Sequence, residues 1–111
     1  MAGLDGLRAN RRGADYHVSK AGLLSLTRSL AAGWGARGIR VNTLAPGAIA
    51  ADFGGGAVRD NPELNRFLAS VTALGRVGEA DDIGGAAAAL MRPDAGWITG
   101  QRVEASGGMF L

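Results

Sequence analysis

The sequence holds one tyrosine and one lysine, and these residues, Tyr16 and Lys20, stand four positions apart. The other basic residues are all arginine, so position 20 carries an ammonium where the rest of the chain uses a guanidinium. On a helix, residues at i and i+4 emerge on one face about one turn apart. A free phenol titrates at about pH 10, and a nearby ammonium favours its anionic form. The pair therefore indicates proton transfer at one substrate atom, with a compact cation that could also contact two hydroxyl groups.

Spacing alone leaves a second interpretation open, in which the pair is two surface residues of a helix. A helix is predicted from Asp15 to the glycines at positions 33, 35 and 38. Its apolar stripe at helical spacing is formed by Leu23, Leu26, Leu30 and Trp34 and widened by Leu24 and Ala31. A short β-branched run over residues 39–45 then meets Pro46-Gly47, which predicts a strand that enters a turn. A helix that feeds directly into a strand is half of a βαβ unit. The fold class expected is therefore α/β with a parallel sheet.

The remaining secondary-structure elements are predicted from the positions of proline, glycine and charged residues. Residues 47–61 are rich in glycine and predict a loop, and Pro62 suits the first turn of a helix over residues 62–73. Acidic residues at positions 79, 81 and 82 predict the start of a second helix that ends before Pro93. Residues 101–105 predict a final strand. Trp34 and Trp97 are expected to be packing residues.

Composition narrows the class of protein. A chain of 111 residues with 47% hydrophobic residues is one globular domain or part of one, and the absence of cysteine excludes disulfides and thiolate metal sites. The net charge is only +2, and the basic cluster of Arg8, Arg11 and Arg12 lacks neighbouring aromatics, which favours a solvated loop over a nucleic-acid site. No apolar run reaches the length of a membrane span. The expected location is the cytoplasm, without nucleic-acid or membrane partners.

Residues 16–21, Tyr-His-Val-Ser-Lys-Ala, resemble the active-site helix of the short-chain dehydrogenases/reductases. The similarity continues through Gly-Ile-Arg-Val-Asn at 38–42, Ala-Pro-Gly-Ala-Ile at 45–49, Leu-Gly-Arg-Val-Gly-Glu at 74–79 and Ile-Thr-Gly-Gln at 98–101. It ends at Gly-Gly-Met over residues 107–109. These blocks stand in the order and at the spacing typical of that family over nearly all of residues 14–109.

The resemblance implies a mechanism and a set of site residues. Tyr16 would exchange a proton with a carbonyl or alcohol substrate while hydride moves to or from NAD or NADP, and Lys20 would assist Tyr16 and hold the nicotinamide ribose. Pro46, Gly47 and Ile49 would lie along the nicotinamide, where a glycine lets backbone approach a flat ring. No metal is implied, and His17 occupies a variable position without an expected catalytic role.

The sequence also departs from the family pattern. Ala51 stands where a threonine is usual, and Ser106 stands where an aspartate is usual. No glycine-rich dinucleotide fingerprint follows a predicted strand, and the family's catalytic serine would fall just before Met1. The resemblance thus predicts that residues 1–111 form a single partial domain, the C-terminal part of a Rossmann-like doubly wound parallel sheet, in a truncated or fragmentary gene product.

Two functions are compatible with these observations. The first is an NAD(P)-dependent oxidoreductase that acts on a small carbonyl or alcohol, with the full-length form expected to be a homo-oligomer. The alternative is a catalytically inactive fragment that acts as an oligomerisation or interaction module. Phe53, Phe67 and Leu68 are candidate pocket residues that suggest a partly apolar substrate. The choice between NAD and NADP stays open, because the residue that reads the ribose is absent from the sequence.

Overall fold

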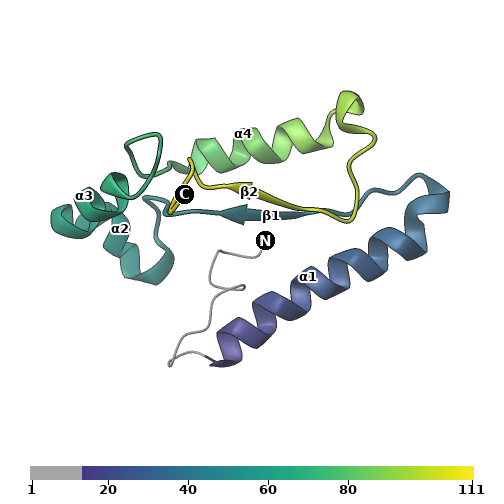
Figure 1. The fold of residues 1–111 in the computed structure, drawn as a ribbon, viewed down its shortest axis with the longest axis horizontal. Coiled ribbons are helices and arrows are strands. Elements are labelled where there is room, and N and C mark those ends of the chain that lie inside the picture. The colour runs from purple at the N-terminus through teal and green to yellow at the C-terminus, as the bar shows by residue number, and fades with distance from the viewer. Residues whose placement is uncertain (1–13) are drawn as a thin grey trace.

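The computed structural model describes residues 14–111 and arranges them as two helical layers around a small sheet (Figure 1). The predicted loop over residues 1–13, with its arginine cluster, lies outside the described residues. The longer elements are, in chain order, α1 (Ala14–Trp34), β1 (Thr43–Pro46), α2 (Ala57–Asp60), α3 (Pro62–Ser70), α4 (Ala80–Met91) and β2 (Arg102–Ala105). Short 3-10 turns are η2 (Gly35–Arg37), η3 (Phe53–Gly56) and η4 (Pro93–Ala95).

The two strands are parallel and hydrogen-bonded neighbours, which confirms the predicted α/β class. Thr43 pairs with Arg102 and Pro46 with Ala105, so both strands run toward the same end of the molecule. Helix α4 lies above the sheet and α1 below it in Figure 1. A parallel pair needs such a helical crossover, and α4 supplies part of it between β1 and β2.

Helix α1 packs on the sheet through part of the predicted apolar stripe: Leu23 and Leu30 are half-buried and Ala31 is buried. Thr27 and Ala31 are the buried residues of α1, whereas Leu26 is 52% exposed and Trp34 is 41% exposed. The two hydroxyl oxygens of Thr27 and Thr43 are 2.6 Å apart. Because Thr27 donates its own proton to the carbonyl of Leu23, Thr43 is the donor between the two hydroxyls. The stripe prediction is therefore confirmed for Leu23, Leu30 and Ala31 and wrong for Leu26 and Trp34, and the buried Thr27 was not part of it.

Strand β1 is shorter than the predicted run over residues 39–45. Before Thr43, the side chain of Asn42 makes hydrogen bonds where regular strand pairing was expected. Its Nδ2 donates to the carbonyl of Ile98 at 2.9 Å, and its Oδ1 accepts from the backbone N–H of Gln101 at 3.1 Å. The N–H of Val41 donates to the side-chain oxygen of Thr99 at 3.1 Å. Side-chain hydrogen bonds therefore join residues 41–42 to residues 98–101, and regular pairing begins only at Thr43.

The helices after β1 begin where proline and acidic residues predicted. Asn61 caps α3 by accepting from the N–H groups of Glu63 and Leu64, both at 3.1 Å. Helix α3 ends at Ser70, before the predicted residue 73, because the next residues turn to bond the C-terminal segment. There the N–H groups of Ala73 and Leu74 donate to the carbonyls of Gly108 and Gly107. The predicted loop over residues 47–61 contains the short helix α2.

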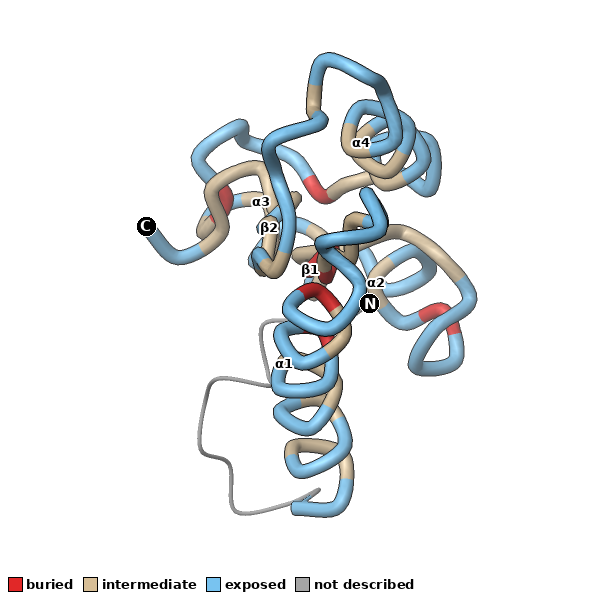
Figure 2. Tube along the Cα trace, turned by 90° about the vertical axis from the view of Figure 1, so that its right-hand side faces the viewer, coloured by how far each residue is buried: buried red, intermediate tan, exposed pale blue. Residues whose placement is uncertain are grey.

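The buried part of the described chain is small and lies where the helices meet the sheet (Figure 2). Its apolar members are Ala31, Leu44, Ala45 and Val77, and its polar members are Thr27, Thr43 and Thr72. Trp97 is 100% exposed, which contradicts its predicted packing role. It stands in the turn between η4 and β2, where the chain reverses direction. Among residues 14–111, no helix combines the length and the apolar character needed to cross a membrane.

Candidate active site at the carboxyl end of the sheet

Tyr16 and Lys20 stand together on the first turns of α1. The Lys20 Nζ lies 5.3 Å from the centroid of the Tyr16 ring, a cation–π separation. The His17 ring meets the Tyr16 ring edge to face, with centroids 5.8 Å apart. Tyr16 and Lys20 are both half-buried, so they remain accessible from solvent. The structure thus brings together the phenol and the ammonium that the sequence placed at i and i+4.

Pro46, Gly47 and Ile49 occupy the end of β1 and the turn that follows it. Pro46 is the last residue of β1, and the N–H of Gly47 donates to the carbonyl of Ala105 at 3.2 Å. Ile49 forms an isolated parallel bridge with Gly78. Backbone hydrogen bonds of 2.8 and 2.9 Å flank that bridge, from Gly78 to Ala48 and from Ala50 to Gly78. This turn is therefore fixed on both sides by segments that follow α3.

The two groups of predicted site residues lie at one end of the molecule. The N-terminal turns of α1 and the carboxyl ends of both strands point to the left in Figure 1. This is the end at which open parallel sheets bind ligands, because the loops that follow the strands gather there. The first turns of α1 and the turn after β1 thus lie toward the same side of the molecule in Figure 1, with α1 below the sheet.

Gly47 is required by a contact within the chain. A Cβ at this position would lie 2.7 Å from the Cβ of Ser106 and 2.8 Å from its Cα, closer than real Cβ atoms approach. The sequence suggested that glycine is needed here so that a flat ring can approach the backbone. In the structure, the backbone of Ser106 approaches Gly47 closely and already requires glycine at this position. Ser106 is in turn held by two hydrogen bonds, since its hydroxyl donates to Glu104 at 2.6 Å and accepts from the N–H of Met109 at 3.3 Å.

A cavity of about 150 Å³ lies between the turn after β1 and the turn after β2. Ile49 and Ser106 line it from these two turns, and Arg76 and Asp82 line it from the segment that leads into α4. Sequence reasoning did not assign Ser106, Arg76 or Asp82 to the site. The available signals were the block over residues 74–79, which served only to mark the family, and the acidic residue at position 82, which served only to predict the start of a helix.

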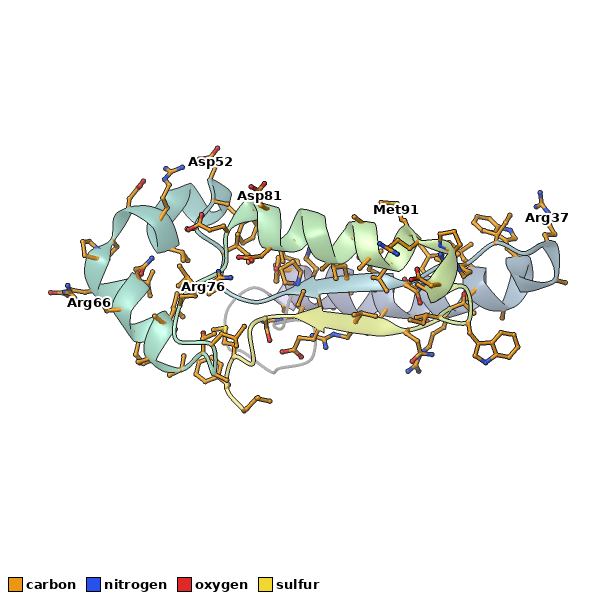
Figure 3. All side chains as sticks on the ribbon, turned by 90° about the horizontal axis from the view of Figure 1, so that it is seen from above. Arg37, Asp52, Arg66, Arg76, Asp81 and Met91 are labelled. Carbon is orange, nitrogen blue, oxygen red and sulfur yellow. The ribbon has the colours of Figure 1, made fainter. Side chains whose placement is uncertain are left out.

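Arg76 and Asp82 form a two-point ion pair beside this cavity. Nη1 and Nη2 of Arg76 donate to the two carboxylate oxygens of Asp82 at 2.7 and 2.9 Å, and the N–H of Glu79 donates to the same carboxylate at 2.8 Å. Hydrogen bonds from Arg76 and then from the Glu79 backbone hold the pKa of Asp82 well below its usual range. The Asp82 carboxylate raises the pKa of Arg76. The pair joins the turn to the first turn of α4, where Figure 3 shows Arg76 and Asp81.

The turn after β1 has the donors that a carboxamide needs. Within residues 14–111, the N–H groups of Ala48 and Ile49 donate no hydrogen bond, whereas the N–H groups of Gly47, Ala50 and Ala51 all do. Two adjacent backbone donors on a fixed turn can bind one carbonyl oxygen. The residues present therefore fit the carboxamide side of a nicotinamide. The phenol of Tyr16 and the ammonium of Lys20 can each donate a hydrogen bond to a hydroxyl or carbonyl oxygen.

Comparison with known proteins agrees with this geometry. A family model described as enoyl-(acyl carrier protein) reductase matches residues 1–110. The chain is 42% identical over 106 residues to 3-oxoacyl-(acyl-carrier-protein) reductase FabG of Haemophilus influenzae, with 96% of this chain and 43% of that protein covered. It is 41% identical over 95 residues to galactitol 2-dehydrogenase (L-tagatose-forming) of Cereibacter sphaeroides, with 86% and 37% covered.

Solved structures give the same result. A reductase named LugOII, described as catalysing keto-reduction during lugdunomycin biosynthesis, superposes with a TM-score of 0.84 at 34% identity, with 96% of this chain and 41% of that chain covered. A short-chain dehydrogenase/reductase variant of Serratia marcescens gives 0.80 at 33% identity, with 99% and 44% covered. The chain spans less than half the length of these relatives. Over that span, in its sequence blocks and in its fold, the chain belongs to the short-chain dehydrogenase/reductase family.

Proposed function

We propose that residues 14–111 supply the proton-transfer residues and the nicotinamide-facing turn of an NAD- or NADP-dependent oxidoreductase that interconverts a carbonyl and an alcohol. The observation that carries this proposal is the Tyr16–Lys20 pair, with 5.3 Å between the ammonium and the ring centroid. It is supported by the turn after β1, where the N–H groups of Ala48 and Ile49 donate no hydrogen bond within residues 14–111. The relatives named above are reductases and dehydrogenases of carbonyl or alcohol compounds. Solved neighbours are described with NAD in one case and with NADPH in another.

The nicotinamide supplies or accepts the hydride when it is bound. In the reducing direction, the Tyr16 hydroxyl donates its proton to the substrate oxygen as the carbonyl becomes an alcohol, and in the oxidising direction it takes that proton back. The Lys20 ammonium favours the phenolate that this transfer leaves behind. The same ammonium, on a flexible stem, binds the ribose hydroxyls. The N–H groups of Ala48 and Ile49 hold the carboxamide, and Pro46 and Gly47 form the floor of that turn.

The experiment measures cofactor binding and carbonyl reduction by the purified chain, with NADH and NADPH in separate titrations. Tyr16→Phe keeps the ring and removes the proton, so we expect the rate of reduction to fall by roughly 10²- to 10⁴-fold while cofactor binding is unchanged. Lys20→Ala is expected to weaken cofactor binding as well. Reduction by Tyr16→Phe at the wild-type rate would refute the assignment. Absence of cofactor binding by a folded wild-type chain would confine the activity to a longer protein.

The second candidate is an interaction module without catalysis, favoured by the exposed apolar residues. Leu26 on α1 is half-exposed and Trp97 is fully exposed, so apolar surface is available on two separate elements. This function predicts self-association that is independent of NADH and NADPH and is abolished by Leu26→Glu or Trp97→Glu. Sedimentation with and without cofactor separates it from the enzymatic proposal. A homo-oligomeric enzyme in the cytoplasm would associate and also bind cofactor.

A further inference from the structure

Strand β2 carries two opposite charges on one face, and the two side chains meet. Residues two positions apart on a strand point to the same side, so Arg102 and Glu104 are neighbours. Nη1 of Arg102 donates to Oε2 of Glu104 at 3.4 Å. The Arg102 side chain is only 18% exposed, and its Nε and Nη2 are buried without a hydrogen-bond partner among residues 14–111. Within those residues, this guanidinium therefore depends on Glu104 for a compensating charge.

The other oxygen of the same carboxylate holds the turn after β2. Oε1 of Glu104 accepts a hydrogen bond from the hydroxyl of Ser106 at 2.6 Å. The oxygen of Ser106 accepts in turn from the N–H of Met109 at 3.3 Å. A hydroxyl donates one hydrogen bond and accepts through its lone pairs, so one side chain serves both contacts. Glu104 thus connects Arg102 in the strand, through Ser106, to the far side of the turn.

The turn that Glu104 holds lies directly against the turn after β1. A Cβ at Gly47 would lie 2.7 Å from the Cβ of Ser106, and the N–H of Gly47 donates to the carbonyl of Ala105 at 3.2 Å. Ser106 and Ile49 line the same cavity of about 150 Å³, one from each turn. A shift of Ser106 therefore moves a wall of this cavity and disturbs the backbone contact of Gly47.

We propose that Glu104 is a positioning residue for the turn that faces the nicotinamide: by accepting from Ser106 and pairing with Arg102, its carboxylate fixes Ser106 against Gly47. This role rests on the proposed function, which assigns Gly47 to the cofactor site. It extends that site to a residue of β2 that does not itself line the cavity. Loss of the carboxylate then weakens cofactor binding and leaves proton transfer by Tyr16 unchanged.

The first test is amide hydrogen exchange in the wild-type 111-residue chain, Glu104→Gln and Ser106→Ala. The informative amide is that of Gly47, because its own hydrogen bond to the backbone of Ala105 is kept in every variant. One variant replaces the charged acceptor by a neutral amide and the other removes the hydroxyl, so we expect exchange at Gly47 to rise about three- to tenfold in both.

The control is Asp94→Asn, which removes a carboxylate that pairs with Arg92 on the surface and should leave exchange at Gly47 unchanged. Exchange at Gly47 that is equal in Glu104→Gln and the wild type would overturn the proposal. A rise of the same size at every protected amide of α1 and α4 would show a loss of global stability, and it would overturn the positioning role as well.

The double variant Glu104→Gln/Ser106→Asp moves the charge from one side chain to the other. It keeps one carboxylate and one hydrogen bond between the two positions, with donor and acceptor exchanged, and the relocated carboxylate can accept from Met109. Ser106→Asp alone sets two carboxylates against each other and should raise exchange at Gly47. The double variant should return exchange to within about twofold of the wild type. An effect as large as the two single effects combined would contradict the link between the two side chains.

The cofactor role is tested on the same variants by titration with NADH and NADPH and by kinetics with acetoacetyl-CoA as the probe substrate. We expect Glu104→Gln to raise Kd and KM for the cofactor about three- to tenfold with little change in kcat, and the double variant to recover most of the loss. Faster exchange at Gly47 with an unchanged Kd would reject the cofactor role. Absence of cofactor binding by the wild type would reject the cofactor role together with the proposed function of this chain, while exchange at Gly47 still decides whether Glu104 positions the turn.

Discussion

At the residue scale, single contacts explain why particular residue types occur in the blocks that resemble the family. Gly47 faces the backbone of Ser106, and Asp82 receives hydrogen bonds from Arg76 and from the Glu79 backbone. Both contacts shape the walls of the cavity at the carboxyl end of the sheet. Substitutions at these positions are therefore expected to lower the stability of the fold, and to affect catalysis only through that loss. A substitution at Tyr16 is expected to affect catalysis directly.

Gly47→Ala is expected to destabilise the chain by about 1–3 kcal/mol, because the added methyl group meets the Ser106 backbone and forces it to shift. Gly33→Ala is the matched control, since Gly33 lies within α1 and a Cβ there meets nothing within 4 Å. The control should be neutral or stabilising by up to about 1 kcal/mol, because glycine is a poor helix former. Urea unfolding of both variants measures the difference, and equal stabilities would contradict the proposed contact.

The Arg76–Asp82 pair predicts a dependence of stability on pH. The pKa of Asp82 is lowered in the folded chain, so its ion pair contributes stability that is fully present above the unfolded carboxyl pKa of about 3.9. That contribution is lost as pH falls from this value toward the folded pKa. The wild type should therefore have a higher Tm than Asp82→Asn at pH 7, and the gap should narrow as the pH approaches 3. Asp81→Asn, in the same turn, is the control and should leave the profile unchanged.

At the element scale, helix α1 depends on a small polar contact with β1. Its two buried residues are Thr27 and Ala31, and the Thr27 hydroxyl lies 2.6 Å from that of Thr43. Ala31 approaches Gly100, where an added Cβ would lie 3.5 Å from the Cβ of Ala31. Tyr16 and Lys20 stand on the first turns of α1, so the orientation of this helix sets where both side chains lie relative to the strands. A substitution at this contact is therefore expected to change the tilt of α1 and so to move Tyr16 and Lys20.

Thr27→Val keeps the shape of the side chain and removes its hydroxyl, which leaves the buried Thr43 hydroxyl without this partner. We expect a loss of about 1–2 kcal/mol in the free energy of unfolding. The double variant Thr27→Val/Thr43→Val should recover part of this loss, because no unpaired hydroxyl then remains in the contact. Leu26→Ala is the control, because Leu26 lies on the same helix and is 52% exposed, and a larger loss there than in Thr27→Val would contradict the importance of the threonine contact.

At the scale of the whole molecule, two layers of helix cover a two-stranded sheet and bury few large side chains. The buried apolar residues of the described chain are small or medium in size, and Trp97 has no protection from solvent. The relatives are more than twice as long as the matched span. The end of β1 and the turn after it carry three of the predicted site residues and the first turns of α1 carry the other two, and their joint role stays a prediction.

The tryptophans report on the assembly of the whole molecule. The sequence has two, and they differ in exposure, with Trp97 at 100% and Trp34 at 41%. In the monomer, Trp34→Phe leaves only Trp97, whose fluorescence should be quenched by iodide as readily as that of a free tryptophan amide. Trp97→Phe leaves Trp34, which should be quenched less. Protection of Trp97 that increases with protein concentration would show that a second copy covers it, as the interaction-module function predicts.

The sequence by itself determined the features that depend on local pattern. Proline, glycine and acidic residues marked where α3 and α4 begin, and the helix-then-strand order predicted the parallel pair. The spacing of Tyr16 and Lys20 placed both on one helix face, and the ordered blocks identified the family. These inferences hold because helix periodicity, caps and strand breaks are set by residues a few positions apart.

Only the tertiary structure decided which surfaces meet. It buried Thr27 beside the predicted Ala31 and left Leu26 exposed, and it placed Ser106 against Gly47 across more than fifty residues of chain. It also used Asn42 to delay the start of β1, where β-branched residues alone predicted strand. Such contacts join segments whose separation no local pattern encodes, and close packing favours small or hydrogen-bonding side chains where hydrophobicity alone favours leucine. The residues that could transfer a proton were therefore predicted from local spacing, whereas the contacts that hold the surrounding segments in place depend on the tertiary structure.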